Sequence, residues 1–416
     1  MLSNLLNSVV RHGQLTVILP DNSRRTYGRG APEVAVKLHD NRAVFELALR
    51  PDLKLGELYM DGRLTVEEGD ITALLDLLMT NLAQRDSCSV MLFLTRGWRR
   101  LIRRFAQFNP APRARAHVHH HYDLSGRLYD MFLDKDRQYS CAYFPDPSAT
   151  LEEAQIAKKR HIAAKLNLDR ENLSVLDIGC GWGGMALDLA RDAGARVTGV
   201  TLSDEQIAIA RARAAKAGLS ERCKFELIDY RAIPGRFDRI VSVGMFEHVG
   251  VAYYPAFFKK VSALLSDDGV GVLHFIGRSD GPGATNPWIA KYIFPGGYTP
   301  ALSEVLPVIE HSGLMVSDVE VLRLHYAETL KEWRRRFRAN WAEVAKVYDE
   351  RFCRMWEFYL AGSEMAFRRE GLVVFQIQMI KRPDALPLTR DYIYERERSM
   401  LFSGVDRMPR RSSRAA

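Results

Sequence analysis

Residues 175–184, with the sequence VLDIGCGWGG, constrain the fold more than any other part of this chain. An apolar run that carries one acid, Asp177, opens into glycines at four of the next seven positions, which is typical of a strand that turns into a loop. Glycine lets the backbone approach a ligand where a Cβ atom would block it. Helix-forming residues follow at 185–193, so the loop is expected to point a helix N-terminus at a nucleotide-type cofactor.

The glycines alone do not identify the cofactor, because Gly179, Gly181 and Gly184 also satisfy the dinucleotide pattern G-x-G-x-x-G. Asp177 lies inside the strand, and an acid there suits the cationic amino end of S-adenosylmethionine better than a pyrophosphate, which it would repel. The next strand, 195–200, is not followed directly by the acid that usually binds the ribose of a dinucleotide. A strand, turn and helix without any ligand is the alternative, but unused glycines would cost stability.

Strand and helix patterns then alternate along the chain. The predicted segments are a helix at 203–217, strands at 223–228 and 237–243, a helix at 253–265 closed by Asp267, Asp268 and Gly269, and a strand at 270–276. This alternation predicts an α/β fold with a doubly wound, mostly parallel, Rossmann-like sheet and a ligand at the carboxyl ends of its strands. Asp229 follows one strand and is a candidate to bind an adenine amino group, although a turn or cap acid explains it equally well.

Prolines at 110 and 112 predict a domain boundary. We expect a smaller α+β N-terminal domain at 1–110, a catalytic domain with a helical cap at 111–400, and a basic flexible tail at 401–416. Within the first domain, the patterns predict strands at 15–19, 34–38 and 43–49 and a helix at 71–82.

The net charge of +8 is concentrated in a few places, and seven arginines with no acid lie between Arg96 and Arg115. Apolar residues at 98, 101, 102 and 105 alternate there with Arg99, Arg100, Arg103 and Arg104, which predicts a basic amphipathic helix. Such a helix binds an anionic membrane surface, packs its apolar stripe on its own protein, or binds the phosphates of a nucleic acid. Its pattern does not separate these roles.

Other features indicate the compartment and argue against a metal. No run reaches the ~18 apolar residues of a membrane span, and no signal peptide is expected from the first twelve residues. Five scattered cysteines fit reduced thiols in a cytoplasm. The histidines at 117, 119, 120 and 121 match no closed zinc site, so we expect no metal.

Few residues are chemically distinctive on their own. Cys141, in the aromatic-rich loop 138–145, has no histidine nearby in sequence to activate it as a nucleophile. Glu247 and His248 follow the strand 237–243, which places them beside a cofactor in this architecture. His274, in an apolar strand, and Tyr326 are uninformative alone.

Several segments together resemble the bacterial cyclopropane-fatty-acyl-phospholipid synthases, in order along 117–381. These segments are QYSCAYF, VLDIGCGWGG, VTGVTLSDEQ, FDRIVSVGMFEHVG and LRLHYAETLKEW. The first hundred residues also resemble the N-terminal domain of the phospholipid-acting members, which the related mycolic acid cyclopropane synthases lack. The resemblance implies a class I S-adenosylmethionine methyltransferase fold, a peripheral enzyme at the cytoplasmic face of the membrane, and a homodimer. It does not imply a nucleic-acid partner.

The resemblance also implies site residues. S-adenosylmethionine would be the methyl donor and would contact Tyr139, Ser140, Gly179, Gly181, Thr201, Leu202, Gln206, Asp229 and Tyr230, beside the Asp177 already inferred. A bicarbonate ion would be bound by Cys141, Glu247, His274, Tyr326 and the backbone of Ile276. Some relatives carry an acid where this chain has Arg231, so position 231 has no clear role.

The implied reaction explains why these residue types are needed. A cis alkene is a poor nucleophile, so the site must align it with a strong electrophile in a dry pocket. Methyl transfer leaves a carbocation, and each aromatic face stabilises it by roughly 0.5–2 kcal/mol. A base must then remove a proton so that the ring closes, and a small hydrogen-bonded anion can do this without forming a lasting ester. The aromatic candidates are Tyr139, Tyr143, Phe144, Phe246 and Tyr326.

Three other interpretations remain. A related fatty-acyl methyltransferase would give a methyl-branched or methylene product from the same cation. A non-catalytic membrane- or RNA-binding protein on this fold would explain the arginines but not Glu247, His274 and Tyr326 together. A methyltransferase for a small soluble acceptor would leave the basic helix without a role.

Overall fold

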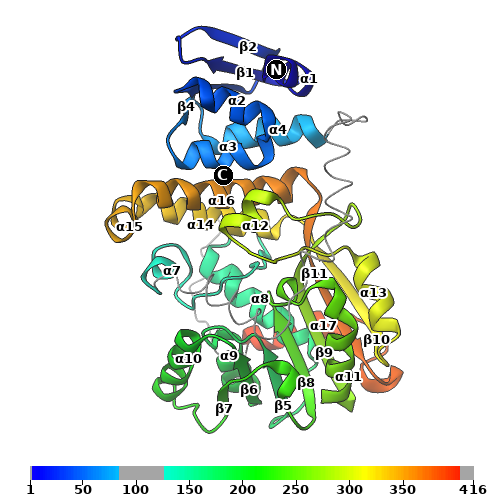
Figure 1. Ribbon diagram of the computed structural model, residues 1–416. Coiled ribbons are helices and arrows are strands. Elements are labelled where there is room, and N and C mark those ends of the chain that lie inside the picture. The colour runs from blue at the N-terminus through cyan, green and yellow to red at the C-terminus, as the bar shows by residue number, and fades with distance from the viewer. Residues whose placement is uncertain (1, 84–125, 403–416) are drawn as a thin grey trace, which may run out of the picture.

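The computed structural model describes residues 2–83 and 126–402, and its N-terminal part forms a separate small sheet with helices (Figure 1). The strand order is β2-β1-β3-β4, with β1 parallel to β3 and antiparallel to β2. The elements are α1 (Leu2–Val9), β1 (Gly13–Ile18), β2 (Arg24–Arg29), β3 (Glu33–Leu38), α2 (Asn41–Leu49), α3 (Pro51–Met60), β4 (Leu64–Glu68) and α4 (Ile71–Ala83).

The predicted strands 15–19 and 34–38 and the helix 71–82 are confirmed as β1, β3 and α4, but the predicted strand 43–49 is wrong. That segment is helix α2, whose first turn is capped because the side chain of Asp40 accepts a hydrogen bond from Ala43 N at 2.8 Å. A short apolar run fits a helix and a strand equally well, and the capping acid is what distinguishes them here. Strands β2 and β4 escaped prediction because they are mostly polar.

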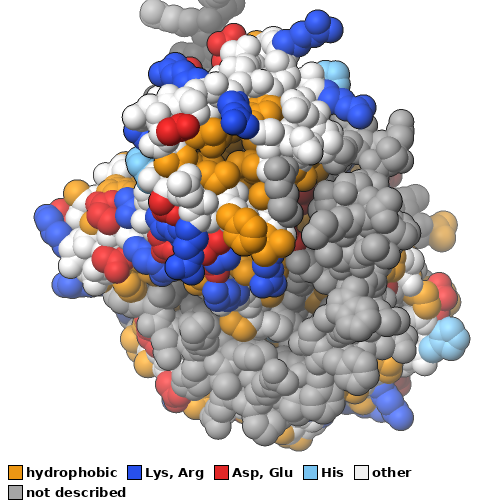
Figure 2. All heavy atoms as spheres, turned by 45° about the horizontal axis from the view of Figure 1, so that its top comes forward, with side chains coloured by type: hydrophobic (Ala, Val, Ile, Leu, Met, Phe, Trp, Pro, Cys, Tyr) orange, Lys and Arg blue, Asp and Glu red, His pale blue; other side chains and the backbone are white. Residues whose placement is uncertain are grey.

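The surface of the N-terminal part carries apolar side chains. Phe45 and Leu49 of α2 are 60% and 44% exposed. Figure 2 shows hydrophobic side chains gathered on the face brought forward in that view, with Lys and Arg side chains beside them.

The second sheet has seven strands in the order β10-β11-β9-β8-β5-β6-β7. Six of them run in one direction, and β11 is antiparallel to both β9 and β10, so the predicted mostly parallel sheet is confirmed. The strands are β5 (Ser174–Ile178), β6 (Arg196–Thr201), β7 (Cys223–Leu227), β8 (Phe237–Val243), β9 (Leu265–Arg278), β10 (Met315–Leu322) and β11 (Leu372–Ile380). Residues 267–269, predicted to close a helix, belong instead to the start of β9.

Helices cover both faces of this sheet, as the alternation of patterns predicted. One buried cluster joins α8, α9 and α10 to the sheet, and another joins α11 and α13 to its other face. The bounds are α8 (Leu151–Lys165), α9 (Gly184–Ala193), α10 (Asp204–Lys216), α11 (Tyr254–Leu264), α13 (Leu302–Glu310) and α17 (Asp391–Phe402), with short 3-10 helices η1 (Tyr230–Ala232), η2 (Phe246–His248), η3 (Val251–Tyr253) and η4 (Pro383–Ala385).

A third group of helices forms a cap that lies between the sheet and the N-terminal part (Figure 1). These are α7 (Gly126–Phe132), α12 (Pro287–Tyr292), α14 (His325–Ala339), α15 (Trp341–Val347) and α16 (Glu350–Arg369). Helices α3 and α4 pack on α16, and Ala361 and Met365 of α16 belong to the core of the N-terminal part. Among the described residues, no helix combines the length and apolarity that crossing a membrane requires.

Candidate functional site

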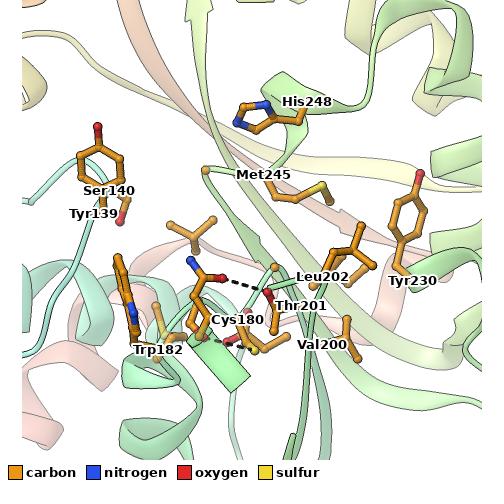
Figure 3. A pocket seen from close by; sticks show the side chains of 18 of the residues that line it. Tyr139, Ser140, Cys180, Trp182, Val200, Thr201, Leu202, Tyr230, Met245 and His248 are labelled. Carbon is orange, nitrogen blue, oxygen red and sulfur yellow. Dashed lines mark hydrogen bonds between the residues drawn. The ribbon is translucent and has the colours of Figure 1, made fainter. Parts of the chain in front are cut away.

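A cavity lies at the carboxyl ends of β5, β6, β7 and β8, where the sheet architecture predicts a ligand. In Figure 3, Tyr139, Ser140 and Trp182 lie on one side of it and Leu202 and Tyr230 on the other. All ten predicted cofactor residues line it: Tyr139, Ser140, Asp177, Gly179, Gly181, Thr201, Leu202, Gln206, Asp229 and Tyr230. The structure therefore brings this predicted set together in one place.

The glycine loop after β5 packs closely against the loop that follows β8. Gly179 has a φ of +81°, and a Cβ atom there would lie 2.9 Å from the Cβ of Met245. Gly183, also at a φ of +81°, is the N-cap of α9, so the helix begins directly at the cavity. The loop thus provides the close backbone approach and the helix N-terminus that its sequence predicted.

Asp177, in β5, is a buried acid in the lining of the cavity. Its side chain is 2% exposed, and its Oδ2 atom has no hydrogen-bond partner among the described residues. Burial raises the pKa of this carboxyl from 3.8 to about 7. An unpaired buried carboxylate is costly unless a cation binds to it, so Asp177 fits the amino group of S-adenosylmethionine.

At the other end of the cavity, Asp229 is already paired. Arg231 Nε and Nη2 donate to the two carboxylate oxygens at 2.8 and 2.6 Å, and Arg231 itself lines the cavity. An adenine amino group would have to share this carboxylate with the guanidinium. Nearby, Thr201 Oγ1 donates to Gln206 Oε1 at 2.8 Å, which fixes both side chains at the cavity wall (Figure 3).

The five residues predicted as catalytic lie outside the lining of this cavity but beside it. Glu247, in η2, accepts a hydrogen bond on Oε1 from Ile276 N at 2.7 Å. Ile276 packs against the apolar cluster that contains Cys141 and Tyr326. His274 precedes Ile276 by two residues on β9, so both side chains face the same side of the sheet. The predicted set therefore lies where β9 and η2 meet the apolar cluster of the cap.

Burial shapes the charge of these groups. Glu247 Oε2 has no hydrogen-bond partner within the described ranges, and desolvation raises the pKa of this carboxyl to about 7. Burial also lowers the pKa of His274 well below its usual value, so the ring is neutral. Gln376 Nε2 lies 3.1 Å from His274 Nδ1 and donates to it, which leaves His274 Nε2–H as a donor.

Cys141 is a poor nucleophile in this setting. Burial raises the pKa of its thiol well above the usual value, and Sγ–H donates to the carbonyl of Ala142 at 3.2 Å. Reactive cysteines have a lowered pKa and a basic partner. The surroundings agree with a residue that shapes the site rather than attacks a substrate.

The five aromatic candidates lie in two apolar clusters. Tyr139 and Tyr326 both contact Trp333, at ring-centroid distances of 5.2 and 5.7 Å. Tyr143 and Phe144 pack against the same cluster, where both lie beside His325. Phe246 packs instead in a separate cluster, with Tyr254, Phe257, Phe258 and Phe275. Phe246 begins the 3-10 helix η2 and is buried in that cluster, whereas Met245 and His248 line the cavity.

Several residues of the site were missed by sequence reasoning. Gln138, Trp182 and Met245 line the cavity, and each lies inside a motif quoted from the sequence, which could have marked them. His248, expected beside the cofactor, lines the cavity as well. Trp333 ends the motif LRLHYAETLKEW, but its contact with Tyr139 joins segments far apart in the chain.

Other predictions fall outside the described residues. These concern the basic helix around 98–105, the histidines 117–121, the boundary near 110 and the tail. Within 2–83 and 126–402, no group of three or more histidine, cysteine or acidic side chains could hold a metal ion.

Comparison with known proteins agrees with the fold and the cavity. Residues 110–377 match the family model of mycolic acid cyclopropane synthetase, and residues 1–87 match a domain family of unknown function. A probable fatty acid methyltransferase of Pseudomonas putida is 36% identical over 377 residues, which cover 88% of this chain and 92% of that protein. The cyclopropane-fatty-acyl-phospholipid synthase of Escherichia coli K12 is 42% identical over 262 residues, which cover 62% of this chain and 65% of that enzyme.

Solved structures give the same result. The cyclopropane synthase MmaA2 of Mycobacterium tuberculosis superposes with a TM-score of 0.61 at 32% identity, over 65% of this chain and 99% of that one. Mycolic acid cyclopropane synthase CmaA1, solved with S-adenosylhomocysteine, gives the same TM-score over 66% of this chain and 99% of that one, at 32% identity. The chain therefore belongs to the mycolic acid cyclopropane synthetase family of S-adenosylmethionine-dependent enzymes.

Proposed function

We propose that the protein transfers a methylene group from S-adenosylmethionine to the cis double bond of unsaturated acyl chains in membrane phospholipids and so forms a cyclopropane ring. The observation that carries this proposal is that the cofactor cavity lies next to an apolar, aromatic cluster. The cavity, in which Asp177 Oδ2 has no hydrogen-bond partner among the described residues, adjoins an aromatic cluster around Trp333 that also contains Cys141 and Tyr326. An apolar acyl chain and a charged donor require this combination.

Different residues would bind the cofactor and stabilise the positive charge on the acyl chain. Bound S-adenosylmethionine would supply an electrophilic methyl group, and Asp177 would bind its ammonium group. Tyr139, Trp333 and Tyr326 would present ring faces to the positive charge that develops on the acyl chain. Trp333 and Tyr326 are buried, which excludes the water that would otherwise capture the cation.

We further propose that a bicarbonate ion is held next to this aromatic wall and supplies the base for ring closure. His274 Nε2–H is an available donor, and Glu247 Oε2 is a buried acceptor that can take a proton from the ion's hydroxyl. The backbone N–H of Ile276 already donates to Glu247, so it orients this carboxylate rather than binding the ion. Undiminished turnover after thorough removal of dissolved carbon dioxide would exclude the ion.

The principal alternative is a methyl-branched or methylene product, and the name of the Pseudomonas putida relative favours it. Incubation with labelled S-adenosylmethionine and vesicles of unsaturated phospholipid tests both. A ring and a methylene group each add CH2 to the acyl chain, but only the ring resists mild hydrogenation. A product that is fully hydrogenated under those conditions, or one heavier than the ring by two hydrogens as a methyl-branched chain is, would overturn the cyclopropane assignment.

Access to the acyl chain requires the protein to rest on a membrane. We propose that the N-terminal domain and the arginine-rich segment around 98–105 dock on an anionic bilayer at the cytoplasmic face, where each arginine contributes about 1 kcal/mol. The exposed Phe45 and Leu49 are apolar contacts available on the same domain. Charge reversal at Arg99, Arg100, Arg103 and Arg104 should abolish binding to anionic vesicles, and unchanged binding would refute the assignment. A homodimer is part of the proposal, and sedimentation equilibrium measures it.

A further inference from the structure

Helix α8 carries a buried lysine directly behind the cofactor cavity. The side chain of Lys158 is 0% exposed, and its Nζ donates to Gln138 Oε1 at 2.5 Å and to Ser140 Oγ at 2.9 Å. Both acceptors line the cavity. A lysine is rarely buried unless its charge serves a partner, so this placement calls for an explanation.

The same helix holds the backbone of this loop from behind. Gln155 Nε2 donates to the carbonyl oxygens of Gln138 and Ser140 at 3.2 and 3.0 Å. Gln138 Nε2 in turn donates to Asp136 Oδ2 at 2.9 Å, and Lys159 Nζ holds the same oxygen at 2.6 Å. The loop therefore has no freedom to turn its side chains away from the cavity.

The hydroxyl of Ser140 has a defined orientation as a result. An ammonium group only donates, so the oxygen of Ser140 accepts from Lys158 and its hydrogen must point elsewhere. Within the described part of the chain, this hydroxyl group donates no hydrogen bond. Because Ser140 lines the cavity, its O–H is directed at whatever the cavity binds.

The opposite charge lies at the same end of the cavity. Asp177 has an oxygen without a partner, and the charge of Lys158 acts on it and favours its ionised form. Burial lowers the pKa of Lys158 to about 8, whereas the charges of Asp134 and Asp136 favour its ammonium form. At this end of the cavity, the carboxylate of Asp177 can bind an ammonium group. The Ser140 hydroxyl, held by the cation Lys158, can donate to a carboxylate. An α-amino acid carries both of these groups.

We propose that Lys158 is a positioning residue for the cofactor: it holds the Ser140 hydroxyl as a hydrogen-bond donor to the carboxylate of the cofactor's amino-acid end. This inference rests on the proposed function only in taking S-adenosylmethionine as the ligand. It assigns recognition of the two charged groups to two different residues, Asp177 for the ammonium group and Lys158 through Ser140 for the carboxylate.

The test compares two ligands that differ only in the carboxylate. Isothermal titration calorimetry measures binding of S-adenosylmethionine and of decarboxylated S-adenosylmethionine to the full-length chain. Lys158→Met should weaken S-adenosylmethionine roughly ten- to hundredfold, the loss expected for a charge-assisted hydrogen bond, and leave the decarboxylated ligand within about threefold. Asp177→Asn should weaken both ligands, because both retain the ammonium group.

Lys165→Met is the matched control. Lys165 is also 0% exposed on α8, but it pairs with Glu320 at 2.5 Å, away from the cavity, so its loss should change neither affinity. Ser140→Ala provides a second variant in case Lys158→Met does not fold, and it should show the same selective loss.

Equal weakening of both ligands by Lys158→Met and Ser140→Ala, or no weakening of either, would overturn the inference. The variants could show the selective loss of S-adenosylmethionine affinity while the wild type makes neither a cyclopropane nor a methylated lipid. This result would refute the proposed function and support the inference. The two failures are therefore distinguishable.

Discussion

Asp177→Asn should make the protein more stable at neutral pH, although it weakens cofactor binding. The carboxyl is 2% exposed, and burial raises its pKa from 3.8 to about 7. The folded state therefore binds more protons than the unfolded chain between pH 3.8 and about 7, and stability falls as the pH rises through this window. Above pH 7 the folded protein is less stable by about 4 kcal/mol than it would be with a permanently neutral group.

The pH dependence separates the free-energy cost of ionising the buried Asp177 carboxyl from any change in packing. Urea unfolding of the wild type and of Asp177→Asn at pH 5 and pH 8 gives the difference in unfolding free energy at each pH. The advantage of the asparagine variant should grow by about 3 kcal/mol between these values. Glu310→Gln, at an exposed position of α13, is the control and should show no such growth.

Two results would refute the reasoning. One is a difference between wild type and Asp177→Asn that stays constant from pH 5 to pH 8, since this would mean that the carboxyl is not desolvated. The other is equal stabilisation of both proteins by S-adenosylmethionine at pH 8, because ligand stabilisation follows affinity and the variant should bind weakly.

Three further predictions concern the chemistry and the loop. Cys141→Ser should retain measurable turnover because the thiol is neutral, whereas Glu247→Ala should lose nearly all product in a labelled-methyl assay; a folded but inactive Cys141→Ser would indicate covalent catalysis instead. Gly181→Ala should weaken cofactor binding in calorimetry, because Gly181 lines the cavity at a φ of +53° and its Cβ would occupy open space where the cofactor binds; unchanged affinity would contradict this. Trp333→Leu should lower kcat roughly three- to thirtyfold, the loss of one cation–π contact, with cofactor affinity unchanged; an unchanged kcat would remove this ring from the reaction.

Local patterns in the sequence were sufficient for the cofactor loop and for five strands of the large sheet, whereas β10 and β11 were not predicted. Apolar runs separated by turn residues mark β5 to β9, and the sheet rule places their carboxyl ends at one edge. The exception, α2, shows the limit of this reasoning, because the apolar run 43–49 has no period that excludes a strand.

Residues whose role depends on tertiary placement could not be found in this way. Lys158 and Lys159 are consecutive in a helix whose pattern is ordinary, and only the folded structure shows that Lys158 is buried against Ser140. Trp333 lies on α14, and its contact with Tyr139 depends on how the cap covers the sheet. By contrast, the pairing of Asp229 with Arg231 two residues later was within reach of the sequence.

Helix α16 belongs to two hydrophobic cores at once, and this has a practical consequence for truncation. Its Trp356 and Leu360 pack in the aromatic cap, while Ala361 and Met365 complete the core of the N-terminal part. A shortened protein that begins after residue 125 would expose an apolar strip on this helix and would be prone to aggregate. Replacing Met365 with a polar residue should restore solubility to such a fragment, which would make the catalytic half available for separate crystallisation.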